Sequence, residues 1–417
     1  MNKNRAISII IIVIAVVLLA LAILYFFFRK GSVPPVEPQV PGSAVFPISP
    51  NAPGTSNTPS SSGNQNQPGY ENQPQTFKQS LRLLSSLPVS GATIFEKNAE
   101  TFVRYVERAT GHIYEVQLSR TEPPYRISNT TIPKIYEAVW VQNGDGVIAR
   151  FLKDGSDEIQ TFYAGLKPSA TSTEQKLVDG TFLASGINAL AVSPTQDRIF
   201  YLVKAGQETF GTRASPNGTL KAQLWSSSAH EWLVSWKESR TITLTTKPSA
   251  DVPGYLYFLD ATSGAFRKIL SGINGLTTLP NSALSFILYS ETIPSSFTLK
   301  LLDTQKQKVS EIGVATLPEK CAWGPVDKTA LFCGVPDNIS SGQYPDAWYQ
   351  GQTSFTDSVW KINIKTGETR MILSPQTVAQ QTMDIINPML NSKEEYLLFM
   401  NKKDLSLWVL DLMGPSF

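Results

Sequence analysis

GYLYFLDATSGAFRKILS, residues 254–271, is a phrase that this chain repeats. It predicts a strand with apolar residues on both faces, a turn at residues 261–264, and a second strand. The phrase returns as SVWKINIKTGETRMILS at residues 358–374, and weaker copies begin at His112, Phe297 and Leu405. Because a lone hairpin cannot bury both of its faces, several copies must stack against one another.

The spacing of these copies indicates a β-propeller. One strand position recurs at Ile113, Phe162, Phe210, Leu256, Thr298, Val359 and Leu407. The intervals between these positions are 49, 48, 46, 42, 61 and 48 residues. A period of roughly 40–50 residues with four short strands is typical of a propeller blade. The sequence therefore predicts an all-β, seven-bladed β-propeller over residues 78–413, with six or eight blades as the alternatives.

The first predicted strand supplies a partner for the last blade. The chain runs only ten residues past the seventh marker position, so a fourth strand for that blade is missing at this end. SLRLLSS at residues 80–86 resembles the fourth-strand phrases RKILS (267–271) and RMILS (370–374). We therefore expect the N-terminal strand to close the last blade, which leaves the ring without an exposed edge.

The turn SPTQD at residues 193–197 precedes an apolar strand, and LYFLD at residues 256–260 precedes a turn that contains glycine. This combination resembles the TolB-type, WD40-like propeller repeat, in which a Ser-Pro-Asp-Gly turn is followed by an apolar strand and an Ile-Tyr-x-x-Asp phrase. No blade of this chain carries the Ser-Pro-Asp-Gly turn intact. The resemblance implies a propeller fold and a binding role, and it carries no catalytic residue over.

The N-terminal stretch is expected to be a membrane anchor. Residues 6–28 are 23 consecutive uncharged positions that end in aromatic residues, followed by Arg29 and Lys30. At about 1.5 Å per residue, a helix of this length spans the roughly 30 Å hydrocarbon core of a bilayer. A cleaved signal peptide and a buried helix are the alternatives, but a signal peptide has a shorter apolar core and a small-x-small cleavage site. Residues 1–30 are therefore predicted to be an uncleaved transmembrane anchor.

Residues 31–77 are rich in Pro, Ser, Asn, Gln and Gly, and they are expected to be a disordered linker. Its root-mean-square reach is on the order of 40 Å. Lys3, Arg5 and the terminal amine slightly outweigh the two basic residues after the anchor, which favours a cytoplasmic N-terminus. The sequence thus predicts a single-pass protein of the cytoplasmic membrane with its propeller outside.

Charge and composition exclude several function classes. The net charge is +2, but four of the 36 basic residues lie in the first thirty positions, leaving 32 against 34 acidic ones. Such a domain lacks the basic footprint of a nucleic-acid-binding protein. Two Cys and two isolated His, at positions 112 and 230, leave little room for a metal site. The acidic segments 143–146 and 154–158 fit hairpin turns better than calcium loops. We expect no metal and no cofactor, and the pattern does not predict an oligomeric state.

Cys321 and Cys333 flank a predicted hairpin centred near Asp327. Pairing in register places the two residues opposite one another, which suits a cross-strand disulfide outside the cytoplasm. The alternative is a pair of buried thiols in the core. Either arrangement is structural.

The longest interval owes its length to residues 334–357, which join the second and third strands of the sixth blade. Such connections lie around the mouth of the central channel, and aromatic side chains there suit contact with a partner or a sugar. The candidate binding residues are Tyr344, Asp346, Trp348, Tyr349 and Phe355. The alternative is that Trp348 and Tyr349 fold back and cap the channel or the blade edge. A second long connection is expected at residues 204–217.

Two functions are consistent with these features. The first is a noncatalytic envelope protein whose anchor, residues 6–28, lies in the lipid bilayer and whose propeller binds another envelope protein or a glycan; a structural or sensory module differs only in its partner. The second is a propeller hydrolase, glycosidase or peptidase-like, with Asp337, Asp346 and Asp357 as the clustered carboxylates at the channel mouth. The sequence contains neither the sialidase Ser-x-Asp-x-Gly-x-x-Trp box nor a Gly-x-Ser-x-Gly segment, so we expect the protein not to be an enzyme.

Overall fold

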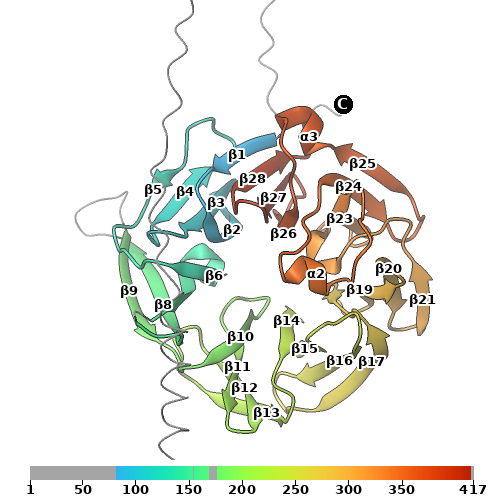
Figure 1. Ribbon diagram of the computed structural model, residues 1–417. Helices are drawn as coiled ribbons and strands as arrows, with labels where there is room; N and C mark the ends of the chain where they lie inside the picture. The colour runs from blue at the N-terminus through green and yellow to red at the C-terminus, as the bar shows by residue number, and fades with distance from the viewer. Residues whose placement is uncertain (1–80, 154, 169–175, 415–417) are drawn as a thin grey trace, which may run out of the picture. The chain divides into compact units, whose positions relative to one another are not determined.

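The computed structural model describes residues 81–153, 155–168 and 176–414. These residues form seven antiparallel sheets of four strands each, which Figure 1 shows as blades around a common axis. The predicted seven-bladed propeller is therefore confirmed. The expected anchor and linker lie outside the described residues, and none of the helices in the described ranges is long and apolar enough to cross a bilayer.

Six blades are each built from four strands that are consecutive in the sequence. Blade 1 contains β2 (Val89–Lys97), β3 (Glu100–Glu107), β4 (Ile113–Gln117) and β5 (Tyr125–Arg126); blade 2 contains β6 (Ile135–Val141), β7 (Gly146–Leu152), β8 (Ile159–Pro168) and β9 (Lys176–Phe182). Blade 3 contains β10 (Ile187–Val192), β11 (Ile199–Ala205), β12 (Glu208–Ala214) and β13 (Ala222–Ser227); blade 4 contains β14 (Trp232–Glu238), β15 (Thr241–Thr246), β16 (Pro253–Asp260) and β17 (Phe266–Asn274). Blade 5 contains β18 (Thr278–Pro280), β19 (Phe286–Ile293), β20 (Ser296–Asp303) and β21 (Lys308–Glu311); blade 6 contains β22 (Cys321–Trp323), β23 (Ala330–Pro336), β24 (Asp357–Asn363) and β25 (Thr369–Leu373).

Blade 7 joins the two ends of the propeller. It consists of β26 (Ile385–Leu390), β27 (Tyr396–Asn401), β28 (Leu407–Asp411) and β1 (Leu81–Ser85). Strand β1 pairs antiparallel with β28, with Leu81 opposite Leu410 and Leu83 opposite Trp408. The predicted closure by the N-terminal strand is confirmed, and each of the seven marker positions falls in the third strand of its blade.

Apolar clusters fill each interface between neighbouring blades. Because successive side chains of a strand point to opposite faces, one strand serves two interfaces. In β23, Leu331 and Cys333 pack toward blade 5, whereas Ala330 and Phe332 pack toward blade 7. This explains why the repeated phrase is apolar on both faces.

The topology defines two faces of the ring. We call the upper face the one that carries the links between blades and the connections from second to third strands; the lower face carries the remaining turns. Lower-face turns hold neighbouring blades together through polar contacts. Arg104 of blade 1 donates hydrogen bonds to the Gly144 carbonyl (2.7 Å) and the Asp145 carboxylate (2.8 Å) of blade 2. Glu394 of blade 7 accepts from the amide of Asp327 in blade 6 at 2.7 Å.

Short helical turns lie between the strands: η1 (Gln142–Gly144), η2 (Pro318–Lys320), α2 (Asp346–Tyr349) and α3 (Pro375–Ala379). The expected long connection at residues 204–217 is wrong. Strand β11 continues to Ala205 and β12 begins at Glu208, so only Gly206 and Gln207 separate them. Gly206 has a φ of 62°, which suits a tight two-residue turn. The pattern of apolar residues in the sequence does not reveal this turn.

Candidate functional site

The connection between β23 and β24, residues 337–356, lies on the upper face and contains α2. Figure 1 shows α2 at the inner end of blade 6, beside the axis of the ring. Three of the predicted binding residues turn inward: Tyr344 is 0% exposed, Trp348 3% and Phe355 2%. They pack with Phe297 and Leu317 into one apolar cluster. This loop therefore carries a core of its own.

The loop core covers a buried lysine, Lys320, at the end of η2. Its Nζ lies 2.6 Å from Oδ2 of Asp357 and 2.5 Å from Oδ1 of Asp384, and it donates to the Ile385 carbonyl at 3.0 Å. All three charged side chains are 0% exposed. The centroids of the Trp348 and Phe355 rings each lie 5.3 Å from the ammonium nitrogen. A charged group that is removed from water needs such partners, because their interactions compensate for the free energy of hydration that it loses.

Asp384 ties the loop to this ammonium. Its carboxylate accepts from Trp348 Nε1 at 3.0 Å, from Ser354 Oγ at 3.1 Å and from the Phe355 amide at 3.0 Å. Asp357 accepts from the Ile385 amide at 2.6 Å. Burial raises the pKa of Asp357 to about 6, and the nearby Asp384 charge adds to the rise while Lys320 opposes it. The group of Lys320, Asp357 and Asp384 has no contact with solvent, so a substrate does not reach it in this conformation.

The same loop connects four consecutive blades across the upper face. Oδ2 of Asp346 accepts from the Ala250 amide of blade 4 at 2.6 Å. The Tyr344 carbonyl accepts from Thr292 of blade 5 at 2.6 Å. The Lys402 ammonium of blade 7 donates to the Trp348 carbonyl at 2.8 Å. The loop thus acts as a bracket over blades 4 to 7.

The three carboxylates that the sequence grouped as hydrolase candidates occupy separate structural positions. Asp337 is exposed and accepts from Ser358 Oγ at 2.7 Å. Asp346 holds a blade 4 amide, and Asp357 belongs to the buried group around Lys320. Of the five predicted binding residues, Tyr349 keeps the largest exposed fraction, 40%, and its hydroxyl donates to Oε1 of Glu319.

The central channel provides a cavity of about 630 Å³. Its wall includes inner-strand residues of several blades and three charged residues that the sequence reasoning did not single out, Glu137, Lys237 and Glu319. Glu319 is half-buried, and its other carboxylate oxygen accepts from Thr277 at 2.9 Å. Burial raises the pKa of Glu319, against the hydrogen bond from Tyr349. Desolvation of its hydroxyl, which donates to Glu319, and the charge of that carboxylate raise the pKa of Tyr349 well above its ordinary value, although 40% of the residue is exposed.

Lys237 lies in β14, and its side chain is exposed toward the channel. It has no hydrogen-bond or ion-pair partner among residues 81–153, 155–168 and 176–414. Desolvation within the ring lowers the pKa of its ammonium, although the side chain is exposed to the channel. A single lysine in a strand gives no sequence signal, so only the fold reveals its position.

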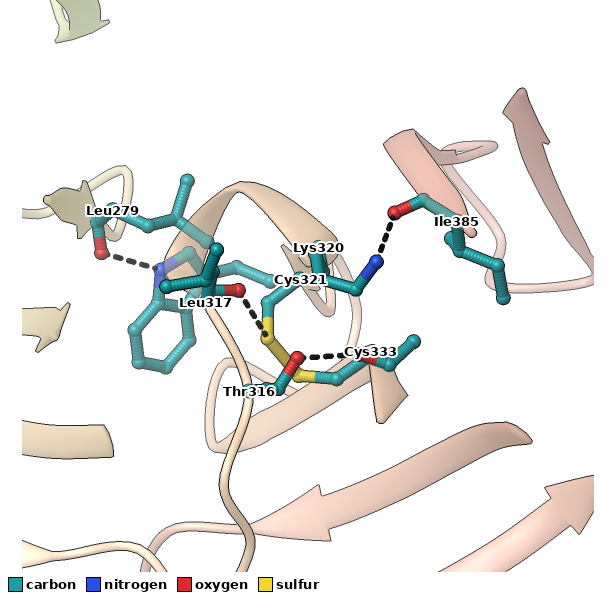
Figure 2. The surroundings of a disulfide bond; sticks show 9 residues. Leu279, Thr316, Leu317, Lys320, Cys321, Cys333 and Ile385 are labelled. Atoms are coloured by element: carbon teal, nitrogen blue, oxygen red, sulfur yellow. Dashed lines mark hydrogen bonds between the residues drawn. A yellow bond between two sulfur atoms is a disulfide. The ribbon is translucent and has the colours of Figure 1, made fainter. Parts of the chain in front are cut away.

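A disulfide joins Cys321 to Cys333 beside the buried lysine. The two residues are register partners in β22 and β23, with 4.1 Å between their Cα atoms. Figure 2 shows Cys321 bonded to Cys333 while its neighbour Lys320 reaches toward the Ile385 carbonyl. Lys320, the last residue of η2, and Cys321, the first residue of β22, thus point in different directions.

A closed ring of seven similar four-stranded blades around a lined channel defines a β-propeller repeat protein. No family model matches the sequence, and no curated protein matches it.

Solved structures match the fold. Prolyl oligopeptidase B from Galerina marginata is 8% identical with a TM-score of 0.55, covering 78% of this chain and 49% of that chain. The tricorn protease is 10% identical with a TM-score of 0.50, covering 80% and 34%. TolB from Acinetobacter baumannii is 10% identical with a TM-score of 0.41, covering 66% and 64%. The chain spans about half the length of prolyl oligopeptidase B. At these identities the likeness to prolyl oligopeptidase B and to the tricorn protease shows the propeller fold alone.

Proposed function

We propose that this protein is a noncatalytic, membrane-anchored propeller outside the cytoplasmic membrane, which binds another envelope protein or a glycan through its upper face. The observation that carries the proposal is the bracket formed by residues 337–356. A long connection held by hydrogen bonds to blades 4, 5 and 7 offers a rigid surface, and rigid surfaces lose little entropy on binding.

The positions of the carboxylates support binding over hydrolysis. Each of Asp337, Asp346 and Asp357 accepts a hydrogen bond from the protein itself. Asp357 and Asp384 are close enough to share one ammonium, but both are fully buried. A glycosidase needs two carboxyl groups that flank an accessible substrate bond.

The disulfide between Cys321 and Cys333 supports a location outside the cytoplasm, because such bonds persist in oxidising compartments. Strand β1 begins at the lower face of the ring, whereas the bracket lies on the upper face.

The experiment is proximity labelling in intact cells with substitutions confined to exposed positions of the bracket. Gln350 and Gln352 are exposed, and their side chains hydrogen-bond to each other. We expect Gln350→Arg with Gln352→Arg to remove the labelled partner, because two bulky charges obstruct the surface without touching its core. The matched control is Gln305→Arg with Gln307→Arg, an exposed pair on the lower face of blade 5.

Loss of the same partner from both double variants, or from neither, contradicts binding through the bracket. A purified full-length chain that turns over a glycan or peptide at a rate abolished by one substitution contradicts the noncatalytic role. Labelling of cytoplasmic proteins alone contradicts the proposed topology.

A further inference from the structure

We propose that the central channel binds a carboxylate monoanion with an apolar stem, and that the Lys237 ammonium receives the carboxylate. This inference deepens the proposed binding role and rests on it, since it names the chemistry that the channel recognises.

The shape of β14 aims Lys237 into the channel. Trp232, Val234 and Trp236 pack into the core between blades 3 and 4. The pairing with β15 is regular up to Ser235 opposite Thr243 and resumes at Glu238 opposite Thr241, so two residues oppose one at this point. This is a β-bulge, a feature that redirects a side chain and recurs beside functional sites. Lys237 lies inside the bulge, and its side chain lines the cavity.

The acidic residues of the channel wall are engaged elsewhere. Oε2 of Glu137 accepts a hydrogen bond from Nη1 of Arg150 at 2.5 Å. Glu319 accepts from two hydroxyl groups, those of Thr277 and Tyr349. In the part of the chain that the structure describes, Lys237 therefore keeps all three of its N–H donors for a ligand. Lys237 is exposed to the channel, so a ligand that enters the channel can reach its ammonium.

The charge and surface of the cavity define the ligand class. One unpaired ammonium balances a single negative charge, so a dianion such as phosphate leaves a charge uncompensated. Much of the remaining wall is apolar, including Val139, Val192, Leu279 and Met389. A carboxylate carrying a short hydrocarbon chain places its charge on Lys237 and its stem on this wall. Two sources have this chemistry: a free small molecule and the C-terminal carboxylate of a partner chain.

The test measures acetylation of individual lysines in the purified full-length chain, in a non-ionic detergent, by mass spectrometry. Hexanoate is the probe, and sodium chloride at equal ionic strength is the reference. When hexanoate is present at ten times its dissociation constant, about one site in eleven is free, so acetylation of Lys237 slows about tenfold. Lys247, an exposed lysine paired with Glu231, is the internal control and keeps its rate.

Three further probes decide the ligand class and its source. Inorganic phosphate and hexylammonium are expected to protect Lys237 no better than sodium chloride does. A four-residue peptide ending in Val-Leu is compared as its free acid and its amide. Stronger protection by the acid than by hexanoate assigns the site to a partner's C-terminus, and the reverse assigns it to a free carboxylate. By calorimetry, Lys237→Met, which keeps a side chain of similar length, is expected to lose hexanoate binding, while Lys237→Arg retains it.

The proposal is overturned if hexanoate protects Lys237 no better than sodium chloride, if phosphate protects it equally, or if Lys237 is not acetylated in the free protein. It is also overturned if Lys237→Met binds hexanoate as the unmodified chain does. These measurements use no cellular partner, so their failure leaves partner capture through Gln350 and Gln352 intact. Conversely, the absence of any labelled partner contradicts the envelope-binding role and does not affect hexanoate binding.

Discussion

Replacing Lys320 with methionine tests whether the buried charge group holds the upper face together. The ammonium lies 2.6 Å from the Asp357 carboxylate and 2.5 Å from the Asp384 carboxylate. At an effective dielectric constant of about 20, each of these contacts gives about 6 kcal/mol of attraction. Desolvation of the ions offsets most of that energy. Removing the cation alone, however, leaves two buried carboxylates without a counter-charge, so we expect the free energy of unfolding to fall by about 3–5 kcal/mol at pH 7.

The assay is urea unfolding of the full-length chain, followed by tryptophan fluorescence. Three matched variants interpret the result. Lys247→Met removes an exposed ion pair with Glu231 and is expected to change the midpoint little. Lys320→Met combined with Asp357→Asn and Asp384→Asn is expected to recover much of the loss, because neutral amides need no counter-charge. A Lys320→Met midpoint equal to that of Lys247→Met refutes the reasoning, and so does a triple variant less stable than the single one.

Three other perturbations have outcomes that follow from the fold. Since burial raises the folded-state pKa of Asp357 from 3.8 to about 6, the folded protein binds a proton more tightly than the unfolded chain does. The stability that this group contributes is therefore present below about pH 4, and roughly 3 kcal/mol of it is lost as the pH rises to about 6. The measurement is urea unfolding of the unmodified chain and of Asp357→Asn across this pH range, and the difference between the two proteins gives the contribution of Asp357. Equal pH slopes of the two proteins contradict this assignment. Replacing Cys321 and Cys333 with alanine removes a crosslink between residues 12 apart and is expected to cost about 3 kcal/mol, measured as the midpoint shift of the variant relative to the unmodified chain without reductant. If reduction lowers the midpoint of the double variant as much as that of the unmodified chain, the loss does not come from this bond. Truncating the chain through Ser85 removes β1 and exposes the edge of β28, so we expect aggregation or loss of the cooperative transition in size-exclusion and unfolding experiments, and a monomer of unchanged stability contradicts the role of β1 in closure.

The ring was predictable from the sequence because each blade repeats the same local pattern of strand and turn residues. A strand that packs on two neighbours must be apolar on both faces, and the turn that follows it needs residues such as Gly264, whose φ is 74°. Both signals are local, so they recur at a readable spacing. The closure by β1 was predictable for the same reason, since its apolar positions match those of other fourth strands.

The site depends on contacts that no local pattern reveals. Lys320 meets Asp384, 64 residues later, because the links into blades 6 and 7 converge on the upper face. Lys237 faces the channel because of a bulge in β14, and the sequence of that strand does not show where its pairing with β15 slips. Both lysines look like ordinary surface residues in the sequence.

The aromatic residues of the bracket show why composition alone left two interpretations open. Tyr, Trp and Phe suit an exposed binding surface and a buried core equally well, since each has a large apolar area. Lys320 accounts for the inward position of Trp348 and Phe355. Its ammonium leaves water to bind two carboxylates, and the rings of Trp348 and Phe355, each 5.3 Å away, complete its enclosure.

The inward aromatics also determine how the upper face can be tested. Replacing the whole bracket with a short flexible turn removes the cover of Lys320 and the hydrogen bonds to Asp384, so any loss of partner then reflects unfolding as much as lost contacts. Substitutions at Gln350 and Gln352 leave those contacts in place. A partner that depends on these exposed positions therefore recognises the surface of the bracket, whereas the stability of the ring depends on the residues beneath it.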